Sequence, residues 1–510
     1  GANNTAMGRH ALGANTTGTR NTAVGANALQ TNTTANDNAA FGYEALKVST
    51  GTGNTAVGNR AMVANTSGSS NVAMGSGTLD ANTTGSYNAA LGAGSLSTNT
   101  TASNNVGVGF HALLLNTTGT ENVAVGTNCL DANTTGGYNT AVGHDALTAN
   151  TTGVSNTAIG YTALYSNTTG FTANTAVGLG TLYANTTGSG NVAVGYTALR
   201  EGTTRINNTA IGFEALRLGS TGNNNTAVGS TVLTNNTANN NTGLGFLALT
   251  ANTTGTGNVA VGASALDANT TGNYNTALGQ HALGANQTGQ YNTGVGQGAL
   301  FKSTANNNTA VGYSALIENT TGTQNVAVGA LALDGNTTGN NNTALGFDSL
   351  ALNTTGTDNV AVGASALDAN TTGFSNVAVG KSALGSNTTA HSNVAIGLTS
   401  LFTNTTGSRN TAVGRDCLKA NTTASNNTAV GRLALTSNTT ASDNVALGSA
   451  TLEFNTTGTN NTGLGRLALN ANTTASNNTA VGRSALLLNT TGTYNTVVGS
   501  LATTQNTTGA

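Results

Sequence analysis

The sequence has no proline and no tryptophan, and only 4% of its 510 residues are aromatic and 6% charged. An ordinary globular domain has about 25% charged residues and many more bulky apolar side chains. Several such domains are therefore not expected in this length. Intrinsic disorder is not expected either, because disordered chains are rich in charge and proline. Collagen is excluded, since it needs proline and a glycine at every third position.

Charge of either sign is also scarce. Fifteen basic and seventeen acidic residues give a net charge of −2, and they are scattered along the chain. Nucleic-acid binding requires a basic stripe that displaces counterions, so we expect no nucleic-acid partner. The apolar runs are only a few residues long, so we expect no membrane span.

What the sequence does contain is one repeat from end to end. The string Asn-(Thr/Val)-Ala-(Val/Ile/Leu)-Gly begins at Asn21, at Asn156 and at Asn275, with Met as the fourth residue in the first copy at Asn4, and nearly every copy starts 17 residues after the previous one. The full period reads N-T-A-V-G-x-x-A-L-x-x-N-T-T-G-x-x, and its positions are numbered 1 to 17 here. A short fixed period is the signature of a solenoid. Division of 510 residues by 17 gives 30 coils.

The period predicts an all-β protein, a β-solenoid or β-roll of about 30 coils. Seventeen residues are too few for a pair of helices, and Gly and Asn interrupt the Ala-rich segments. We expect a short strand over T-A-V-G, a two-residue corner, a second extended segment that begins with Ala-Leu, and a turn at N-T-T-G. Changes of period length fall in the N-T-T-G half, at residues 47–53, 167–173 and 301–307, which is typical of a tolerant loop.

The repeat has no break that would mark a domain boundary. We interpret residues 1–510 as a single continuous repeat array. The sequence starts and stops within the pattern, so we expect it to be a window of a longer fibrous protein.

Asparagine recurs at positions 1 and 12. Stacked coils place equivalent residues about 4.8 Å apart, so position 1 predicts a ladder of hydrogen-bonded amides. The predicted members of this ladder include Asn4, Asn21, Asn54, Asn122, Asn208 and Asn342. Position 12, the Asn of N-T-T, predicts a second ladder with a few interruptions. We expect no cofactor. The alternative is a Ca²⁺ column held by the position-12 turns, for which the candidate ligands are Asn15, Asn82, Asn133 and Asn269.

Glycine at position 5 and leucine at position 9 are the candidate core. The residues singled out are Leu12, Leu113, Leu333, Gly8, Gly25 and Gly245. Two arrangements remain open because a strand alternates its faces. Val and Leu could fill a slim single-chain core. Alternatively, Ala and Gly could face a cramped interior while Val and Leu form an apolar stripe for another chain.

Candidates for chemistry are few. The sequence has five histidines, His10, His111, His144, His281 and His391. They are many coils apart, so we expect neither a metal site nor a catalytic dyad. Cys129 and Cys417 both replace the position-8 Ala, and at 4.8 Å per coil they lie roughly 80 Å apart, too far for a disulfide. We therefore expect no enzyme, and we interpret both cysteines as small buried side chains.

The N-T-T triplet also matches the acceptor pattern for N-glycosylation. We expect this turn to face solvent. Sugars attached every 4.8 Å would collide, so we expect sparse modification or none.

At residues 122–130 the motif N-V-A-V-G-x-x-A-L resembles the head repeats of YadA-like trimeric autotransporter adhesins. The longer N-T-A-x-G-x-x-A-L-x-x-N-T-T-G period is similar to repeats of bacterial surface and phage tail-fibre-like proteins. The resemblance implies a left-handed β-roll, trimerisation through apolar faces, and an adhesive or fibrous role outside the cell.

These observations predict a structural extracellular filament or adhesin shaft at the cell surface. We expect the chain to self-associate as a homotrimer, filament or bundle, and to contact a host or environmental surface. The alternative is ligand binding by a flat repeating face. Ice is the most specific ligand of this kind, because threonine recurs at positions 2, 13 and 14.

Overall fold

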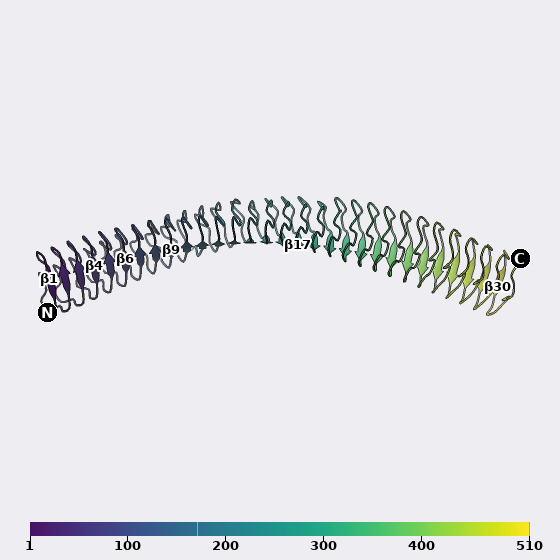
Figure 1. The fold of residues 1–510 in the computed structure, drawn as a ribbon, viewed down its shortest axis with the longest axis horizontal. Helices are drawn as coiled ribbons and strands as arrows, with labels where there is room; N and C mark the ends of the chain where they lie inside the picture. Colours follow the sequence, from purple (N-terminus) through teal and green to yellow (C-terminus); the bar gives the residue numbers. More distant parts are fainter. Residues whose placement is uncertain (171, 509–510) are drawn as a thin grey trace. The chain divides into compact units, whose positions relative to one another are not determined.

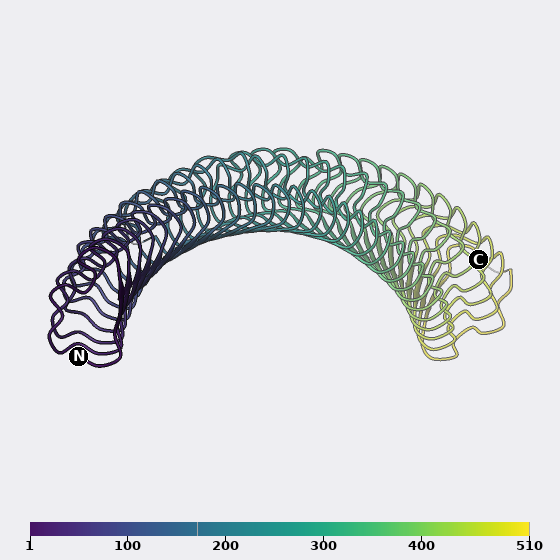
Figure 2. The same ribbon diagram turned by 60° about the vertical axis from the view of Figure 1, so that its left-hand side comes forward.

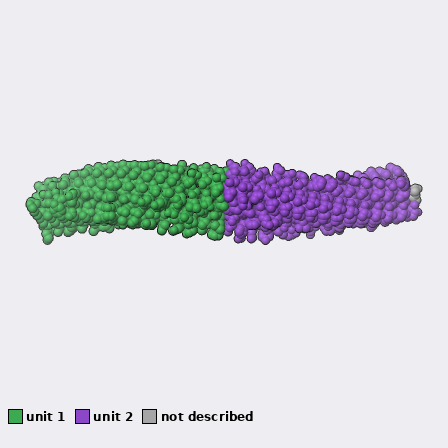
Figure 3. All heavy atoms as spheres, turned by 90° about the horizontal axis from the view of Figure 1, so that it is seen from above, with its two compact units in different colours: residues 1–256 green, residues 257–510 purple. Residues whose placement is uncertain are grey.

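The computed structural model of the 510-residue chain describes residues 1–170 and 172–508. It forms two compact units, residues 1–256 and residues 257–510, coloured green and purple in Figure 3. That residues 1–510 form one continuous array stays a prediction, as does the left-handed winding.

The first unit is built from three-residue strands that follow one another in chain order (Figure 1). Its strands are β1 (Thr5–Met7), β2 (Thr22–Val24), β3 (Ala39–Phe41), β4 (Thr55–Val57), β5 (Val72–Met74), β6 (Ala89–Leu91), β7 (Val106–Val108), β8 (Val123–Val125), β9 (Thr140–Val142), β10 (Thr157–Ile159), β11 (Thr175–Val177), β12 (Val192–Val194), β13 (Thr209–Ile211), β14 (Thr226–Val228) and β15 (Thr242–Leu244).

The second unit repeats this construction, and its coils are seen as a series of similar loops in Figure 2. Its strands are β16 (Val259–Val261), β17 (Thr276–Leu278), β18 (Thr293–Val295), β19 (Thr309–Val311), β20 (Val326–Val328), β21 (Thr343–Leu345), β22 (Val360–Val362), β23 (Val377–Val379), β24 (Val394–Ile396), β25 (Thr411–Val413), β26 (Thr428–Val430), β27 (Val445–Leu447), β28 (Thr462–Leu464), β29 (Thr479–Val481) and β30 (Thr496–Val498).

Within each unit, every strand pairs in parallel with the strand of the next coil. In the first unit, for example, β9 and β10 pair with Ala141 opposite Ala158, one period further along. In the second unit β22 and β23 pair with Ala361 opposite Ala378. No helix occurs among the described residues. The predicted all-β solenoid with a period of about 17 residues is therefore confirmed.

The interior combines parts of both arrangements that the sequence left open. In the coil of β8, Ala124 and Leu130 are fully buried, whereas Val123 and Val125 are half-buried and point outward. Side chains alternate along a strand, so the inward alanine at position 3 forces positions 2 and 4 to the outside. Leucine therefore faces inward and valine outward. Leu113 and Leu333 are fully buried, and Leu12, in the first coil, is half-buried.

The expected second extended segment is wrong, because the chain turns at Ala-Leu. The position-9 leucines have left-handed backbone conformations, with φ of 55° at Leu113 and 54° at Leu333. A strand would turn Ala112 and Leu113 to opposite faces, whereas the left-handed turn lets both be buried. This conformation costs about 1–2 kcal/mol for a residue with a Cβ. Full burial of a leucine side chain, at about 1.5–3 kcal/mol, offsets that cost.

The position-5 glycines lie at a corner rather than in the core, which corrects the assignment of Gly8, Gly25 and Gly245. Gly8 is exposed and the other two are half-buried. Their φ angles are 129°, 133° and 130°, a region that favours glycine. A Cβ on Gly8 would lie 2.6 Å from the carbonyl oxygen of Gly25 in the next coil. Backbone conformation and close contact between coils therefore require glycine here.

Replacing Gly346 by alanine tests this requirement. Its φ is 140°, and a Cβ would lie 2.6 Å from the carbonyl carbon of Gly363. We expect a loss of about 2–5 kcal/mol in the stability of the adjoining coils. In hydrogen-exchange mass spectrometry, those coils should lose protection while distant coils of the same unit keep it.

Gly298→Ala is the matched control within the second unit. Its φ is 68°, and a Cβ there would have Ile317 Cδ1 as its nearest neighbour, at 3.5 Å. We expect a loss of only about 1–2 kcal/mol, the cost of a left-handed alanine. Equal losses in the two variants would show that contact between coils does not set the requirement for glycine.

Candidate functional site

Within each unit the position-1 asparagines form a hydrogen-bonded ladder, as predicted. The backbone N–H of Asn122 donates to Asn105 Oδ1 at 2.9 Å, and its Nδ2 donates to the Gly136 carbonyl at 2.9 Å. Asn122 Oδ1 in turn accepts the backbone N–H of Asn139 at 3.0 Å. Each amide thus bonds to the coils on both sides. Of the chosen residues, Asn21, Asn54, Asn122, Asn208 and Asn342 are fully buried and Asn4 is half-buried.

The position-12 asparagines form the second predicted ladder. Asn133 Nδ2 donates to Asn116 Oδ1 at 2.8 Å and to the Gly136 carbonyl at 2.9 Å. The Gly136 carbonyl therefore accepts one amide from each ladder. Serine takes the place of asparagine at Ser49 and Ser303, where its hydroxyl accepts the amide of the next coil, while Asn32 Oδ1 on the other side of Ser49 has no partner.

Threonine hydroxyls of the N-T-T turn form a third ladder, as the sequence favours without indicating which Thr column makes it. The position-13 threonine hydroxyls donate to the carbonyl of the equivalent residue in the next coil, as in Thr117 to Thr134 and Thr134 to Thr151, both at 3.0 Å. The position-14 threonines, such as Thr135, are exposed. The two adjacent Thr columns look alike in the sequence, and only the turn geometry separates a bonded column from an exposed one.

The expectation that the N-T-T asparagine faces solvent is wrong. Asn133 and Asn150 are fully buried, and Asn133 Oδ1 accepts the amide of Asn150 at 2.9 Å. The ladder draws these side chains inward because their amides satisfy backbone carbonyls there. A sugar on these nitrogens would have no room in the folded coil.

The proposed Ca²⁺ ligands do not fit a cation. Asn82 Oδ1 already accepts the amide of Asn99 at 2.9 Å, and Asn15 Oδ1 accepts that of Asn32 at 3.3 Å. Asn133 and Asn269 likewise accept the amides of Asn150 and Asn286. Calcium needs six to eight oxygen ligands, and here N–H groups lie between the oxygens. Binding would break the ladder, so the turns are better described as structural.

The acidic D-A-N-T-T segments do not make cation sites either. Partial burial raises the pKa of the Asp131 carboxyl, and nearby Asp145 raises it further. Burial also raises the pKa values of Asp80, Asp267 and Asp368. Among the described residues, no group of three His, Cys, Asp or Glu side chains could hold a metal ion.

Both cysteines lie in the interior with free thiols. Cys129 Sγ is 3.1 Å from the Ala141 carbonyl, and Cys417 Sγ is 3.2 Å from the Ala429 carbonyl. Burial raises the pKa of each thiol to about 12. Since the thiolate is the reactive form, neither cysteine is activated as a nucleophile.

One cation is buried inside the first unit, and sequence reasoning missed it. Arg205 is 1% exposed, and its Nη1 donates to the Leu216 carbonyl at 2.8 Å while its Nε and Nη2 have no hydrogen-bond partner. The guanidinium occupies space that two missing position-12 side chains leave, because Gly202 and Gly219 replace asparagine there. Burial lowers its pKa to about 10, so it still carries its charge at neutral pH.

The outward strand face consists of the side chains at positions 2 and 4 of the strands in each unit. Position 2 is Thr, Val or Ala, and position 4 is Val, Ile, Leu, Met or Phe in every strand. Met74, Leu91 and Leu345 are more than 40% exposed. The face carries no charge.

Neither a scan against protein-family models nor a search of curated proteins finds a match for this chain. The described residues contain no helix with the length and apolar character needed to cross a bilayer. The likeness of the motif to YadA-like heads therefore rests on the sequence pattern alone.

Asn122→Leu tests the first ladder. Leucine has nearly the same shape but leaves the Gly136 carbonyl short of one amide and the N–H of Asn139 without its acceptor. We expect a loss of about 2–5 kcal/mol, since each unsatisfied buried group costs about 1–3 kcal/mol. Denaturant unfolding measures it. Thr135→Leu, on the exposed Thr column, is the control and should change stability by less than about 0.5 kcal/mol. A similar loss in both variants would argue against the ladder.

Restoring the repeat around Arg205 should stabilise the first unit. In the triple variant Gly202→Asn, Gly219→Asn and Arg205→Gly, two amides replace an unpaired buried charge. We expect a gain of about 1–4 kcal/mol, measured by denaturant unfolding. Arg60→Asn, at an exposed corner, removes a positive charge without this gain. A less stable triple variant would mean that the guanidinium is well accommodated.

Proposed function

We propose that this protein is a structural filament or adhesin shaft outside the cell. The observation that carries the proposal is the separation of roles within each coil. The inward positions build hydrogen-bonded ladders and a narrow core. The outward strand face presents the same uncharged surface coil after coil in each unit.

The same face supports self-association. Exposed apolar surface on this scale is rare on monomeric soluble proteins, and a regular face complements a second copy of itself. We propose that copies of the chain associate through the outward strand face as a homotrimer or bundle. The variable residues at the corners, where the repeat tolerates many residue types, would then contact a host or environmental surface.

Light scattering tests this association. We expect a mass that is a multiple of 49.9 kDa and uniform elongated particles in negative-stain micrographs. Val142→Lys, Ile159→Lys and Val177→Lys together place three charges on the outward strand face of β9–β11, and they should reduce the mass towards one chain. Thr152→Lys, Thr169→Lys and Thr187→Lys add the same charges to the exposed Thr column of the same coils. A monomer at high concentration, or equal effects of both triple variants, would overturn the proposal.

Binding of a regular surface such as ice has one observation in its favour. Threonine opens most strands and projects from the outward strand face. The longest uninterrupted threonine run within a unit is three strands, for example β9–β11, before valine intervenes. This interruption favours the filament over an ice-binding lattice. If the wild-type chain showed thermal hysteresis, ice binding would be favoured over the filament.

A further inference from the structure

A shallow cavity of about 280 Å³ lies in each unit at the corner that follows the strand. In the first unit it spans the coils of β10, β11 and β12, and in the second unit those of β17, β18 and β19. The middle coil of each cavity has glycine at position 7, Gly180 or Gly298. The two cavities, called the Gly180 notch and the Gly298 notch, therefore have the same construction within the repeat.

The missing side chain explains the space. Position 7 is left-handed in every coil, and its side chain normally covers this corner, as Asn128 does with φ of 50°. A Cβ on Gly180 would have Thr197 Cγ2 as its nearest atom, at 3.6 Å, so nothing else fills the notch. The other two position-7 glycines differ. The His111 ring covers Gly94, with Cδ2 2.7 Å from a Cβ there, and the Gly77 coil carries Asp80 at position 10.

An aromatic ring forms one wall of each notch. Phe301 and Tyr183 occupy position 10 of the coils that contain Gly298 and Gly180. Tyr183 stacks on Tyr165 with ring centroids 5.1 Å apart, and the guanidinium of Arg200 lies 5.5 Å from its centroid. The His281 ring meets Phe301 edge-on at 6.0 Å. These neighbours hold the rings in place. Because Tyr165 and Arg200 cover the two faces of Tyr183, the ring open to a ligand in the Gly180 notch is that of Tyr196.

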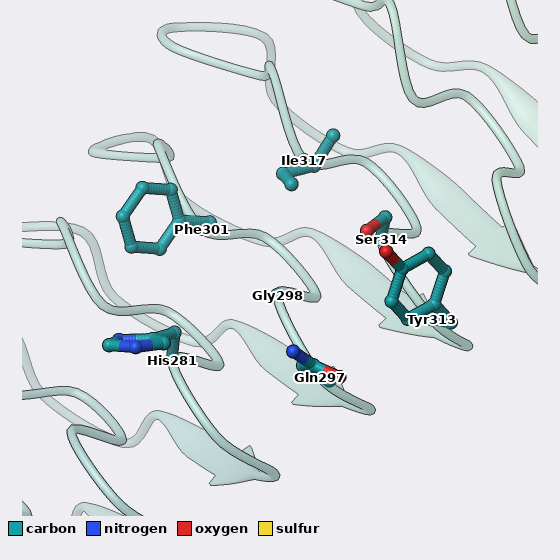
Figure 4. Close-up of a pocket in the computed structure, with 7 residues that line it drawn as sticks. All are labelled: His281, Gln297, Gly298, Phe301, Tyr313, Ser314 and Ile317. Carbon is teal, nitrogen blue, oxygen red and sulfur yellow. The ribbon is translucent and has the colours of Figure 1, made fainter.

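Polar groups face the rings across each notch. Figure 4 shows Phe301 and His281 on one side of Gly298, with Tyr313 and Ser314 on the other. In the Gly180 notch, Tyr196 is 48% exposed. Thr197 lies beside it at 5% exposure, and its hydroxyl has no hydrogen-bond partner. Rotation of that hydroxyl towards the notch would give it a partner on a ligand.

We propose that the Gly180 and Gly298 notches each bind one pyranose ring of a neutral glycan. A pyranose has an apolar face of C–H groups that packs on an aromatic ring and a rim of hydroxyls that bonds to amide, hydroxyl and imidazole groups. The volume lies at the lower end of small-molecule pockets, which fits a single ring. Glycan binding goes beyond the filament role, because a shaft needs neither notch.

Saturation-transfer NMR on the full chain tests the proposal. The probes are the methyl glycosides of glucose, galactose and N-acetylglucosamine, each at millimolar concentration, where weak single-ring binding is detected. We expect transfer to at least one probe. Gly180→Asn with Gly298→Asn fills both notches with a residue native to position 7, and binding should weaken by at least about tenfold.

Gly77→Asn is the matched control, since it changes the same position beside no ring, and it should bind as the wild type does. Tyr196→Leu with Phe301→Leu keeps the apolar bulk but removes stacking, and affinity should fall roughly twofold to tenfold. Absence of transfer to all three probes, or undiminished binding by the filled variant, would overturn the proposal. Light scattering of the filled variant keeps the outcome separate from the filament role, because its self-association should be unchanged.

Discussion

The fold depends on satisfying backbone carbonyls inside a coil too narrow for water. Three-residue strands pair only a few backbone groups, and the turns leave carbonyls such as that of Gly136 directed inward. A buried carbonyl without a donor costs about 1–3 kcal/mol. The asparagine amide meets this need in a short side chain, since Nδ2 reaches a carbonyl and Oδ1 accepts from the next coil. Ladders of asparagine are therefore required once the coil is this slim.

The ladders and the period could be predicted from the sequence because they repeat at fixed spacing. The direction of each side chain was harder to predict. Ala112 and Leu113 are neighbours that are both buried, and only a left-handed leucine allows this. Leucine rarely adopts that conformation, so no propensity favours it. The notches depend on pairs such as Gly298 with Phe301, which one coil brings together and the repeat pattern hides as variable positions.

Arg205 shows what the interior tolerates. Relative to the repeat, Gly202 and Gly219 replace two asparagines and Arg205 replaces a glycine. The guanidinium still donates a hydrogen bond to the Leu216 carbonyl. The total side-chain volume is roughly kept, while the hydrogen bonds are not. At this one site the core keeps its packing and gives up ladder bonds, which agrees with the close packing of protein interiors. At the corners neither constraint applies, and the variable residues that could distinguish one coil from another are found there.

The ladder bonds that join neighbouring coils link residues about 13 to 18 positions apart wherever they lie in a unit, as in Asn122 to Gly136 and Asn122 to Asn139. Chain-closure entropy is therefore the same for each added coil and does not grow with chain length. Low contact order of this kind favours rapid propagation once a first pair of coils has formed. The absence of proline also removes the slow isomerisation step that delays many folding reactions. At synthesis rates of about 5–20 residues per second, a ribosome would release one coil roughly every 1–3 s, slowly enough for each to dock before the next appears.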